Sequence, residues 1–234
     1  MGQRHQYGIR NEMRPVIFIG TIVALLLLSG CAWFNQDQVE KPAAELVQEG
    51  MGAFDKGDYS DAIKAFEQLK DWYPFSKYAI VAELKIADSH YYLDQYAEAV
   101  TAYEEFEQLH PRNEAIPYVI YQIGRCYYDQ IDTIDRDQTS ARKALETFRR
   151  LIRQFPEDPY AIKAHTHITI CLQSLSGHEF YVGKFYMRSK HYRAALERFK
   201  AVISEYPDVG MHYQALKYIT QCEALAAMAE SEKK

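Results

Sequence analysis

The sequence predicts an all-α protein: a superhelix of stacked helix pairs that follows an N-terminal export segment. Two observations support this fold class. A pattern of one alanine, one aromatic residue, one apolar residue and one proline recurs four times between residues 62 and 207. A short apolar run that ends near a cysteine precedes these copies. Such self-similarity is the signature of repeat proteins, whose units bury their apolar faces against one another.

The composition is that of a globular protein with an acidic body. The 234 residues suit one domain plus a targeting segment, and charged residues make up 25% and aromatic residues 14% of the chain. Residues 1–30 carry three arginines and one glutamate. Because their net charge is +2 and the whole chain carries −5, the remainder carries −7. Phosphate binding needs clustered Lys and Arg, so the acidic body argues against nucleic acid as a partner.

Residues 1–30 have the order of a bacterial lipoprotein signal peptide. A basic start precedes an apolar run over 16–28, which is shorter than the roughly twenty residues that span a bilayer. The tripeptide Leu-Ser-Gly then leads to Cys31, and this sequence resembles the lipobox of bacterial lipoproteins. We therefore expect cleavage before Cys31 and lipidation of its thiol. The alternative is a plain signal anchor with a chance cysteine.

The residues that follow Cys31 indicate a destination. An aspartate directly after the lipidated cysteine retains lipoproteins of well-studied Gram-negative bacteria in the inner membrane, and this chain has Ala32 there. We therefore expect a lipid-anchored protein on the periplasmic face of the outer membrane. Residues 31–42 show no helical period and end at Pro42, so they are predicted to form a lipidated tether.

The four copies match position by position. Each opens with Ala, carries an aromatic residue four positions later and an apolar residue three positions after that, and reaches Pro twelve positions after the Ala. These spacings place the first three residues on one helix face, and the proline ends the helix. The four sets are Ala62/Phe66/Leu69/Pro74, Ala99/Tyr103/Phe106/Pro111, Ala144/Phe148/Leu151/Pro156 and Ala195/Phe199/Val202/Pro207.

Each copy is predicted to follow a first helix whose small residue allows close packing. That residue is Gly50, Ala87 or Gly183, each twelve positions before the alanine, whereas Gly124 lies twenty before it. The pattern resembles the tetratricopeptide repeat. We therefore expect a tetratricopeptide-like superhelix of about five helix-pair repeats over residues 43–230, and a non-repeat helical bundle is the alternative. Three tripeptides are predicted to form the tight turns within the pairs: GDY at 57–59, DQY at 94–96 and KHY at 190–192.

The copies are unevenly spaced, which locates the insertions. Successive prolines are 37, 45 and 51 residues apart, whereas regular repeats recur about every 34 residues. The stretch 158–182 is too apolar for a loop and is predicted to be an added or lengthened helix, and 211–230 to form a final unpaired helix. Cys126, Cys171 and Cys222 are predicted to be buried small hydrophobes, although an oxidising compartment would allow one pair to form.

Three segments depart from a generic repeat: YPFSKYA (73–79), HPRNEAIPYVIYQIG (110–124) and DRDQTSARKALETFRRLIRQFP (135–156). Together with the lipobox and the long fourth helical segment, they resemble the BamD family of outer-membrane assembly lipoproteins, also called ComL. The resemblance implies a subunit of the β-barrel assembly machinery that binds a POTRA domain of the insertase and unfolded outer-membrane protein precursors. It also implies that Arg198 contacts the insertase, and a solvated helix charge is the alternative.

The first helix of each pair lines the inner surface of such a superhelix. Tyrosine offers a large contact area with a hydroxyl, and arginine can hold a carboxylate through two hydrogen bonds. We therefore predict a groove for an extended peptide with aromatic side chains and a terminal carboxylate, and tyrosines packed between helices are the alternative. The predicted substrate groove consists of Phe54, Lys85, Asp88, Tyr91, Tyr92, Tyr121, Arg125 and Tyr128, with Met51, Asp55 and Asp129 on the same faces.

No catalytic or cofactor motif appears in the sequence, so we expect a binding scaffold that is not an enzyme. Phosphate-binding loops and the GxSxG and HExxH motifs are absent. His165 and His167 point about 200° apart on a helix, so we expect neither a metal site there nor a cofactor. Rival hypotheses are a secretin pilotin, a Tol-system coordinator and a peptidoglycan hydrolase. Co-purified partners separate the first two, and a deep pocket with a catalytic carboxylate would mark the third.

Overall fold

The structure is a computed structural model that describes residues 40–231. The predicted signal peptide, the lipidation of Cys31 and most of the tether lie outside these residues and stay predictions. The part from Pro42 onward forms one compact unit. Within the described range the chain forms nine α-helices and no strand, which confirms the all-α prediction. None of these helices combines the length and the apolar character that crossing a bilayer requires.

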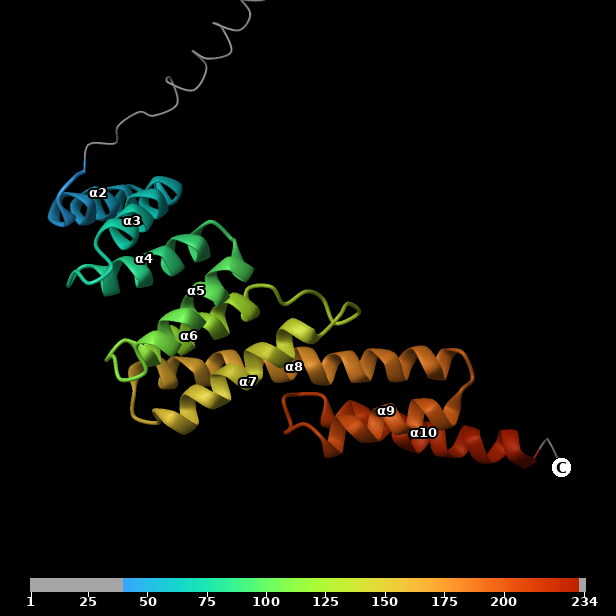
Figure 1. Cartoon of the computed structure of the whole chain (residues 1–234). Helices are drawn as coiled ribbons and strands as arrows, with labels where there is room; N and C mark the ends of the chain where they lie inside the picture. Colours follow the sequence, from blue (N-terminus) through green and yellow to red (C-terminus); the bar gives the residue numbers. More distant parts are fainter. Residues whose placement is uncertain (1–39, 232–234) are drawn as a thin grey trace, which may run out of the picture. The chain divides into compact units, whose positions relative to one another are not determined.

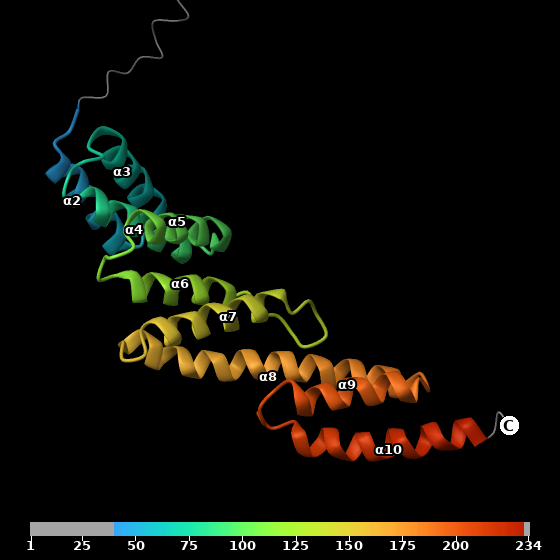
Figure 2. The same cartoon turned by 60° about the horizontal axis from the view of Figure 1, so that its bottom comes forward.

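The helices stack as pairs in chain order (Figures 1 and 2). Each helix packs against the next one, and first helices of successive pairs also meet, α2 with α4 and α6 with α8. The described residues therefore hold four helix pairs and one final helix, which is a tetratricopeptide-like superhelix. The helices are α2 (Ala43–Lys56), α3 (Tyr59–Trp72), α4 (Ala79–Tyr92), α5 (Tyr96–Leu109), α6 (Ile116–Tyr128), α7 (Thr139–Gln154), α8 (Pro159–Arg188), α9 (Tyr192–Ser204) and α10 (His212–Ser231).

Tight turns join the paired helices where the tripeptides predicted them. Gly57, Asp94 and Lys190 occupy the same position in three of these turns and adopt φ angles of 83°, 56° and 60°. A residue in this left-handed region ends one helix, and the next helix begins two positions later in all three turns. The third pair differs because residues 129–138 join α6 to α7, which explains why Gly124 lies twenty positions before its alanine and not twelve.

The recurring aromatic residue of a second helix packs on the small residue of its first helix. A Cβ atom added at Gly50 would lie 2.6 Å from Cε1 of Phe66, which is closer than real Cβ atoms approach other atoms. Glycine at position 50 therefore leaves the space that the ring of Phe66 occupies between the helices. The same contact explains why the small residue recurs in the sequence. The other two pairs are Gly124 with Phe148 and Gly183 with Phe199.

The extra residues before Gly183 lengthen a helix and do not add one. Helix α8 is 30 residues long and serves both as the partner of α7 and as the first helix of the fourth pair. Its N-cap residue is Asp158, whose carboxylate accepts a hydrogen bond from the amide of Tyr160 at 2.7 Å, and Pro159 occupies the first helical position. Both features favour a helix start.

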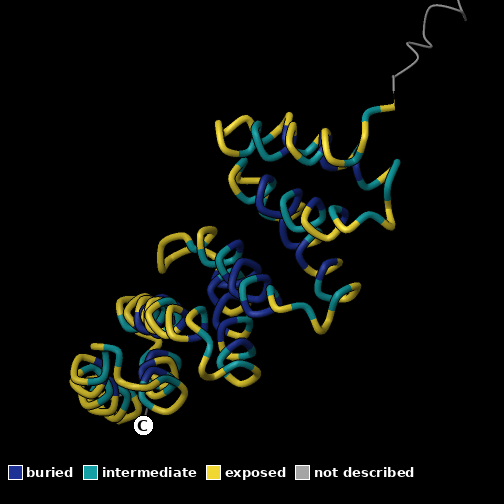
Figure 3. Tube along the Cα trace, turned by 90° about the vertical axis from the view of Figure 1, so that its left-hand side faces the viewer, coloured by how far each residue is buried: buried dark blue, intermediate teal, exposed yellow. Residues whose placement is uncertain are grey.

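Buried residues lie all along the stack (Figure 3). Their apolar side chains form three clusters. One joins α2, α3 and α4, a central one extends from α4 to α8, and one joins α8, α9 and α10. Cys126, Cys171 and Cys222 lie within these clusters, are 0% exposed and are free thiols, which confirms that they are small buried hydrophobes. The first cluster, named the N-terminal cluster, consists of Leu46, Ala62, Phe66, Leu69, Ala79, Ala82 and Ile86.

Candidate functional site

A group of ring side chains, which we name the aromatic face, joins the first two helix pairs. It consists of Phe54 of α2, Tyr59 of α3, Tyr91 and Tyr92 of α4, and Tyr96 of α5. The ring of Tyr92 stacks on Tyr59 with centroids 4.9 Å apart. Its other neighbours, Phe54 and Tyr91, stand edge-on at 5.7 and 5.5 Å. Because Tyr92 is 51% exposed, the face is open to solvent.

Lys85 adds a cation to the aromatic face. Its ammonium lies 4.2 Å from the ring centroid of Phe54 and 2.8 Å from Oδ2 of Asp88. The ring and the carboxylate both stabilise the charge, and the lysine side chain remains 25% exposed. The structure therefore brings Phe54, Lys85, Tyr91 and Tyr92 of the predicted groove together on one face.

Asp88 does not line the surface, and its assignment to the groove is wrong. Its residue is 2% exposed, and Oδ1 accepts hydrogen bonds from the hydroxyls of Tyr103 and Tyr118, both at 2.7 Å. With Lys85 on Oδ2, this buried carboxylate ties α4 to α5 and α6. Burial and the charge of Asp88 raise the pKa of both tyrosine hydroxyls, so they remain donors. Asp88 positions helices and does not contact a ligand directly.

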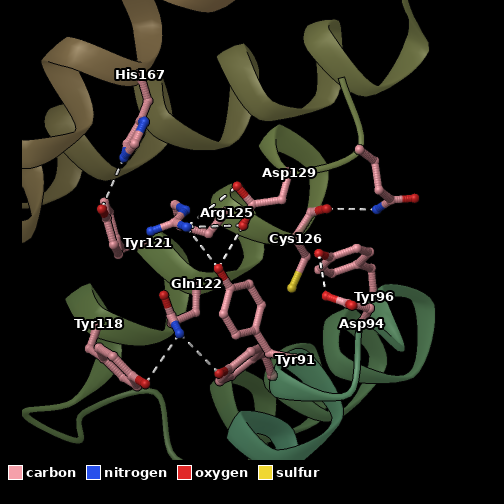
Figure 4. A network of polar contacts seen from close by, with 12 residues as sticks. Tyr91, Asp94, Tyr96, Tyr118, Tyr121, Gln122, Arg125, Cys126, Asp129 and His167 are labelled. Atoms are coloured by element: carbon pink, nitrogen blue, oxygen red, sulfur yellow. Dashed lines mark hydrogen bonds and ion pairs between the residues drawn. The ribbon is translucent and has the colours of Figure 1, made fainter. Parts of the chain in front are cut away.

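Arg125, Tyr91 and Asp129 form a polar triad between α4 and the end of α6 (Figure 4). The Nη2 group of Arg125 donates to the hydroxyl oxygen of Tyr91 at 2.8 Å and to Oδ2 of Asp129 at 3.0 Å. The hydroxyl of Tyr91 in turn donates to Oδ2 of Asp129 at 2.6 Å. The side chains of Arg125 and Asp129 are 30% and 21% exposed. The triad therefore holds a partly accessible guanidinium beside the aromatic face.

The site offers hydroxyl groups that stay protonated and a guanidinium that stays charged. Burial and the hydrogen bond to Asp129 raise the pKa of Tyr91 above its usual range. The hydrogen bond to Asp94, at 2.8 Å, raises the pKa of Tyr96 to about 12. Burial acts to lower the pKa of Arg125, but its hydrogen-bonding neighbours outweigh this effect and raise it. Neutral hydroxyls and one fixed cation suit binding.

The third repeat buries Tyr121, so its assignment to the groove is also wrong. The residue is 8% exposed, and its hydroxyl lies 3.0 Å from Nε2 of His167 on α8. The ring of Tyr128 lies 4.4 Å from the same imidazole, and Tyr128 is half-buried. Burial and the charge of Arg125 lower the pKa of His167. The long helix α8 therefore covers the part of α6 that carries Tyr121.

Arg198 lies on α9, outside the aromatic face. Its Nη1 group donates to Oε2 of Glu179 on α8 at 2.9 Å, and its side chain is 45% exposed. Two hollows lie elsewhere, one between α3, α4 and α5 and one between α5, α6 and α7. Neither is lined by residues of the predicted groove. In the part of the chain that the structure describes, no three His, Cys, Asp or Glu side chains gather as metal ligands would.

Three residues of the site escaped the sequence reasoning: Tyr59, Tyr96 and His167. The tripeptides GDY and DQY did single out Tyr59 and Tyr96, but as turn residues. Each begins the second helix of its pair and turns its ring toward α4, where it contacts Tyr92 or Tyr91. No sequence signal places His167 against α6, because its position depends on the course of the lengthened helix α8.

Comparison with known proteins relates this architecture to one family. The sequence model of a family described as "YfiO: Outer membrane lipoprotein" matches residues 39–234. A protein of Caulobacter vibrioides named "Outer membrane protein assembly factor BamD" is 28% identical over 225 residues, which cover 94% of this chain and 74% of that protein. A protein of Rickettsia prowazekii with the same name is 30% identical over 214 residues, which cover 91% and 85% of the two chains.

Solved structures also show distant similarity to this chain. A crystal structure of a MamA protein is 14% identical, covers 82% of this chain and 91% of its own, and gives a TM-score of 0.41. The crystal structure of a tetratricopeptide repeat protein from Parabacteroides merdae is 14% identical, covers 82% of this chain and 78% of its own, and gives a TM-score of 0.42.

Proposed function

This chain belongs to the YfiO family of outer membrane lipoproteins, and we propose that it is a lipid-anchored subunit of the machinery that assembles β-barrel proteins in the outer membrane. The names of its relatives support this role. The lipobox at Cys31 supports the anchor, and a helical repeat suits a scaffold. A Cys31→Ser chain should appear in the soluble periplasmic fraction, and retention in the membrane would contradict the anchor.

The substrate in this proposal is an extended segment of an unfolded barrel precursor. The observation that carries it is the polar triad: a guanidinium, partly exposed, whose Cζ lies 5.8 Å from the ring centroid of Tyr91 on the aromatic face. Successive side chains of an extended peptide point to opposite sides. Aromatic residues at every second position therefore form one row, which can contact the five rings of the aromatic face. The terminal carboxylate of the peptide can then pair with Arg125. Asp129 already occupies one edge of this guanidinium, so a peptide must share it.

The test is fluorescence anisotropy with a labelled peptide that has alternating aromatic residues and a free C-terminal carboxylate. Arg125→Glu and Tyr91→Ala should each weaken binding about tenfold or more, because each removes a charge-assisted or aromatic contact. Arg125→Gln should weaken it less, since the amide keeps a donor. An amidated peptide should bind the unchanged protein more weakly and should lose its sensitivity to Arg125.

Arg150→Glu is the matched control. Arg150 also forms an ion pair, with Glu107, and is 31% exposed compared with 30% for Arg125, but it joins α7 to α5. The control should bind the peptide normally. Unchanged affinity in an Arg125→Glu, Tyr91→Ala double variant that circular dichroism shows to be folded would refute this substrate site.

The insertase contact belongs, in this proposal, to the last two helices. Helix α10 ends the stack within the described residues and exposes Tyr213 (82%), Leu216 (54%) and Met228 (62%). Apolar side chains on the outer face of a terminal helix favour a partner surface, because capping repeats are normally polar there. Arg198→Glu should reduce co-purification of the insertase. Arg150→Glu is the control, because Arg150 also pairs with an acid on another helix but lies on α7, outside the last two helices. Equal co-purification in both variants would contradict the contact.

A further inference from the structure

The connection between α3 and α4, residues 73–78, exposes an aromatic side chain. Phe75 is 102% exposed, the largest value among the large apolar side chains of the described residues. The first turn of α4 follows with Ile80 at 39% and Val81 at 43%. Single exposed apolar residues are common on soluble proteins, but three within seven positions form a patch that requires a physical reason.

Anchored neighbours on both sides hold Phe75 outward. Trp72, Tyr73 and Tyr78 pack against the N-terminal cluster. The amide of Ser76 donates to the carbonyl of Tyr73 at 2.9 Å, and the amide of Tyr78 donates to Oγ of Ser76 at 3.2 Å. Since the flanking residues are fixed in this way, Phe75 cannot reach the core without breaking these contacts.

The segment itself carries one positive charge and no negative charge. Between Asp71 and Glu83 the chain has no acidic residue and one basic residue, Lys77. Lys77 is exposed, with its ammonium 5.0 Å from the ring centroid of Tyr78. The carboxylate of Glu83 lies 2.6 Å from Nε2 of His110 and so faces a partner within the protein. Aromatic residues with lysine are typical of segments at the boundary between lipid headgroups and acyl chains.

The patch lies at the edge where the N-terminal segment enters the domain. Two residues join α2 to α3, so the helices run antiparallel and the end of α3 lies beside the start of α2. Figure 1 shows the start of α2 and the connection from α3 to α4 on the same, left-hand side. Eleven positions separate Cys31 from Pro42, which is a reach of at most about 40 Å for an extended chain. A lipid on Cys31 would keep this edge close to the bilayer.

We propose that residues 73–81 form a membrane-contact patch, in which Phe75 inserts at the headgroup boundary of the bilayer and Lys77 faces anionic headgroups. The patch rests on the proposed function, because the lipid anchor brings this edge to the membrane. It would give the first repeat a fixed orientation relative to the bilayer, with the aromatic face held at a defined height. A segment of another protein is the competing occupant, but the short tether and the lysine favour a lipid surface.

The test compares a nitrobenzoxadiazole dye at two positions of the full lipidated chain in vesicles of phosphatidylethanolamine and phosphatidylglycerol. The dye is attached to Phe75→Cys or, as a matched control, to Tyr213→Cys on α10, where the native aromatic residue is 82% exposed. The buried cysteines of the described part are 0% exposed and do not compete for the label. We expect the dye at position 75 to shift to the blue and to lose most of its emission to nitroxide-labelled lipids, and the dye at position 213 to do neither.

A second set of chains separates the patch from the anchor. These chains carry Cys31→Ser and an N-terminal polyhistidine tag on nickel-chelating lipid, so that their result does not depend on lipidation. If the untagged chains fail to float with vesicles, the anchor is overturned and the tagged chains decide on the patch. Equal quenching at both positions, or none at position 75, overturns the patch. A blue shift at position 75 with a barrel-precursor peptide, and none on vesicles, assigns it to a protein partner instead.

Discussion

Two glycines of α2 allow the packing rule of the repeats to be measured within a single helix. A Cβ atom at Gly50 would lie 2.6 Å from Cε1 of Phe66, a ring that is 0% exposed, whereas a Cβ atom at Gly52 meets no atom within 4 Å. Alanine at either position improves helix propensity by the same amount, about 0.5–1 kcal/mol. Alanine at Gly50 must also displace the buried ring, and overpacking of this kind costs about 1–3 kcal/mol.

Gly52→Ala should therefore stabilise the protein by about 0.5–1 kcal/mol, and Gly50→Ala should be about 1–3 kcal/mol less stable than Gly52→Ala. The difference between the two variants isolates the packing, because the propensity gain is common to both. Urea unfolding followed by tryptophan fluorescence measures it, since Trp72 packs against the N-terminal cluster.

A second substitution tests the mechanism. Phe66→Leu should be less destabilising in the Gly50→Ala background than in the unchanged protein, because a smaller side chain makes room for the new methyl group. Gly50→Ala as stable as Gly52→Ala would show that the ring moves freely. The requirement for glycine at this helix crossing would then be wrong.

Three further predictions concern the site and the core. Asp129→Asn should tighten binding of a free-acid peptide about fivefold by anisotropy, because Arg125 loses the competing charge. His167→Gln should reduce the loss of thermal stability on acidification. Burial lowers the pKa of the histidine in the folded state below 6.5, so the unfolded state takes up the proton first as the pH falls. The stability of the unchanged protein therefore decreases as the pH drops through and below 6.5. The thiols of Cys126 and Cys171, with pKa values raised to about 12 by burial, should react with Ellman's reagent only after denaturant is added.

Each of these predictions has a clear contrary outcome. Equal affinity of Asp129→Asn for the free-acid peptide would mean that the guanidinium does not meet the carboxylate. Identical melting temperatures across the acidic range in the His167→Gln variant and the unchanged protein would assign the pH dependence to other groups. Rapid thiol reaction without denaturant would show that the central cluster opens readily.

The sequence predicted the repeat because its small set of requirements is local. The spacing from Gly50 to Ala62, Phe66 and Pro74 is fixed by one turn and two helix faces, and the structure shows each of these residues in the expected role. The same reasoning located the tight turns and the final helix. A helix pair can therefore be recognised from residues that lie within one repeat.

The errors in the predicted groove arise where two repeats meet. Asp88 follows its small residue just as Arg125 follows Gly124, but Tyr118 from the next repeat covers Asp88, whereas the side chain of Arg125 stays 30% exposed. Tyr121 is buried because α8 was lengthened. Neither fact is encoded in the spacing within one repeat, because each depends on how a neighbouring helix passes over it.

Two groups of hydrogen bonds, one at Asp88 and one at Arg125, lie between the second and third repeats. They explain how helices that otherwise make apolar contacts can support a defined site. Apolar packing alone allows helices to slide with little change in free energy, whereas hydrogen bonds to a buried carboxylate have fixed geometry. Tyr118 of α6 reaches Asp88 of α4 at 2.7 Å, and Arg125, two turns further along α6, reaches Tyr91 at 2.8 Å. Since both bonds join the same two helices, they fix the position of α6 along α4. The guanidinium therefore stays beside the aromatic rings whether or not a peptide is bound.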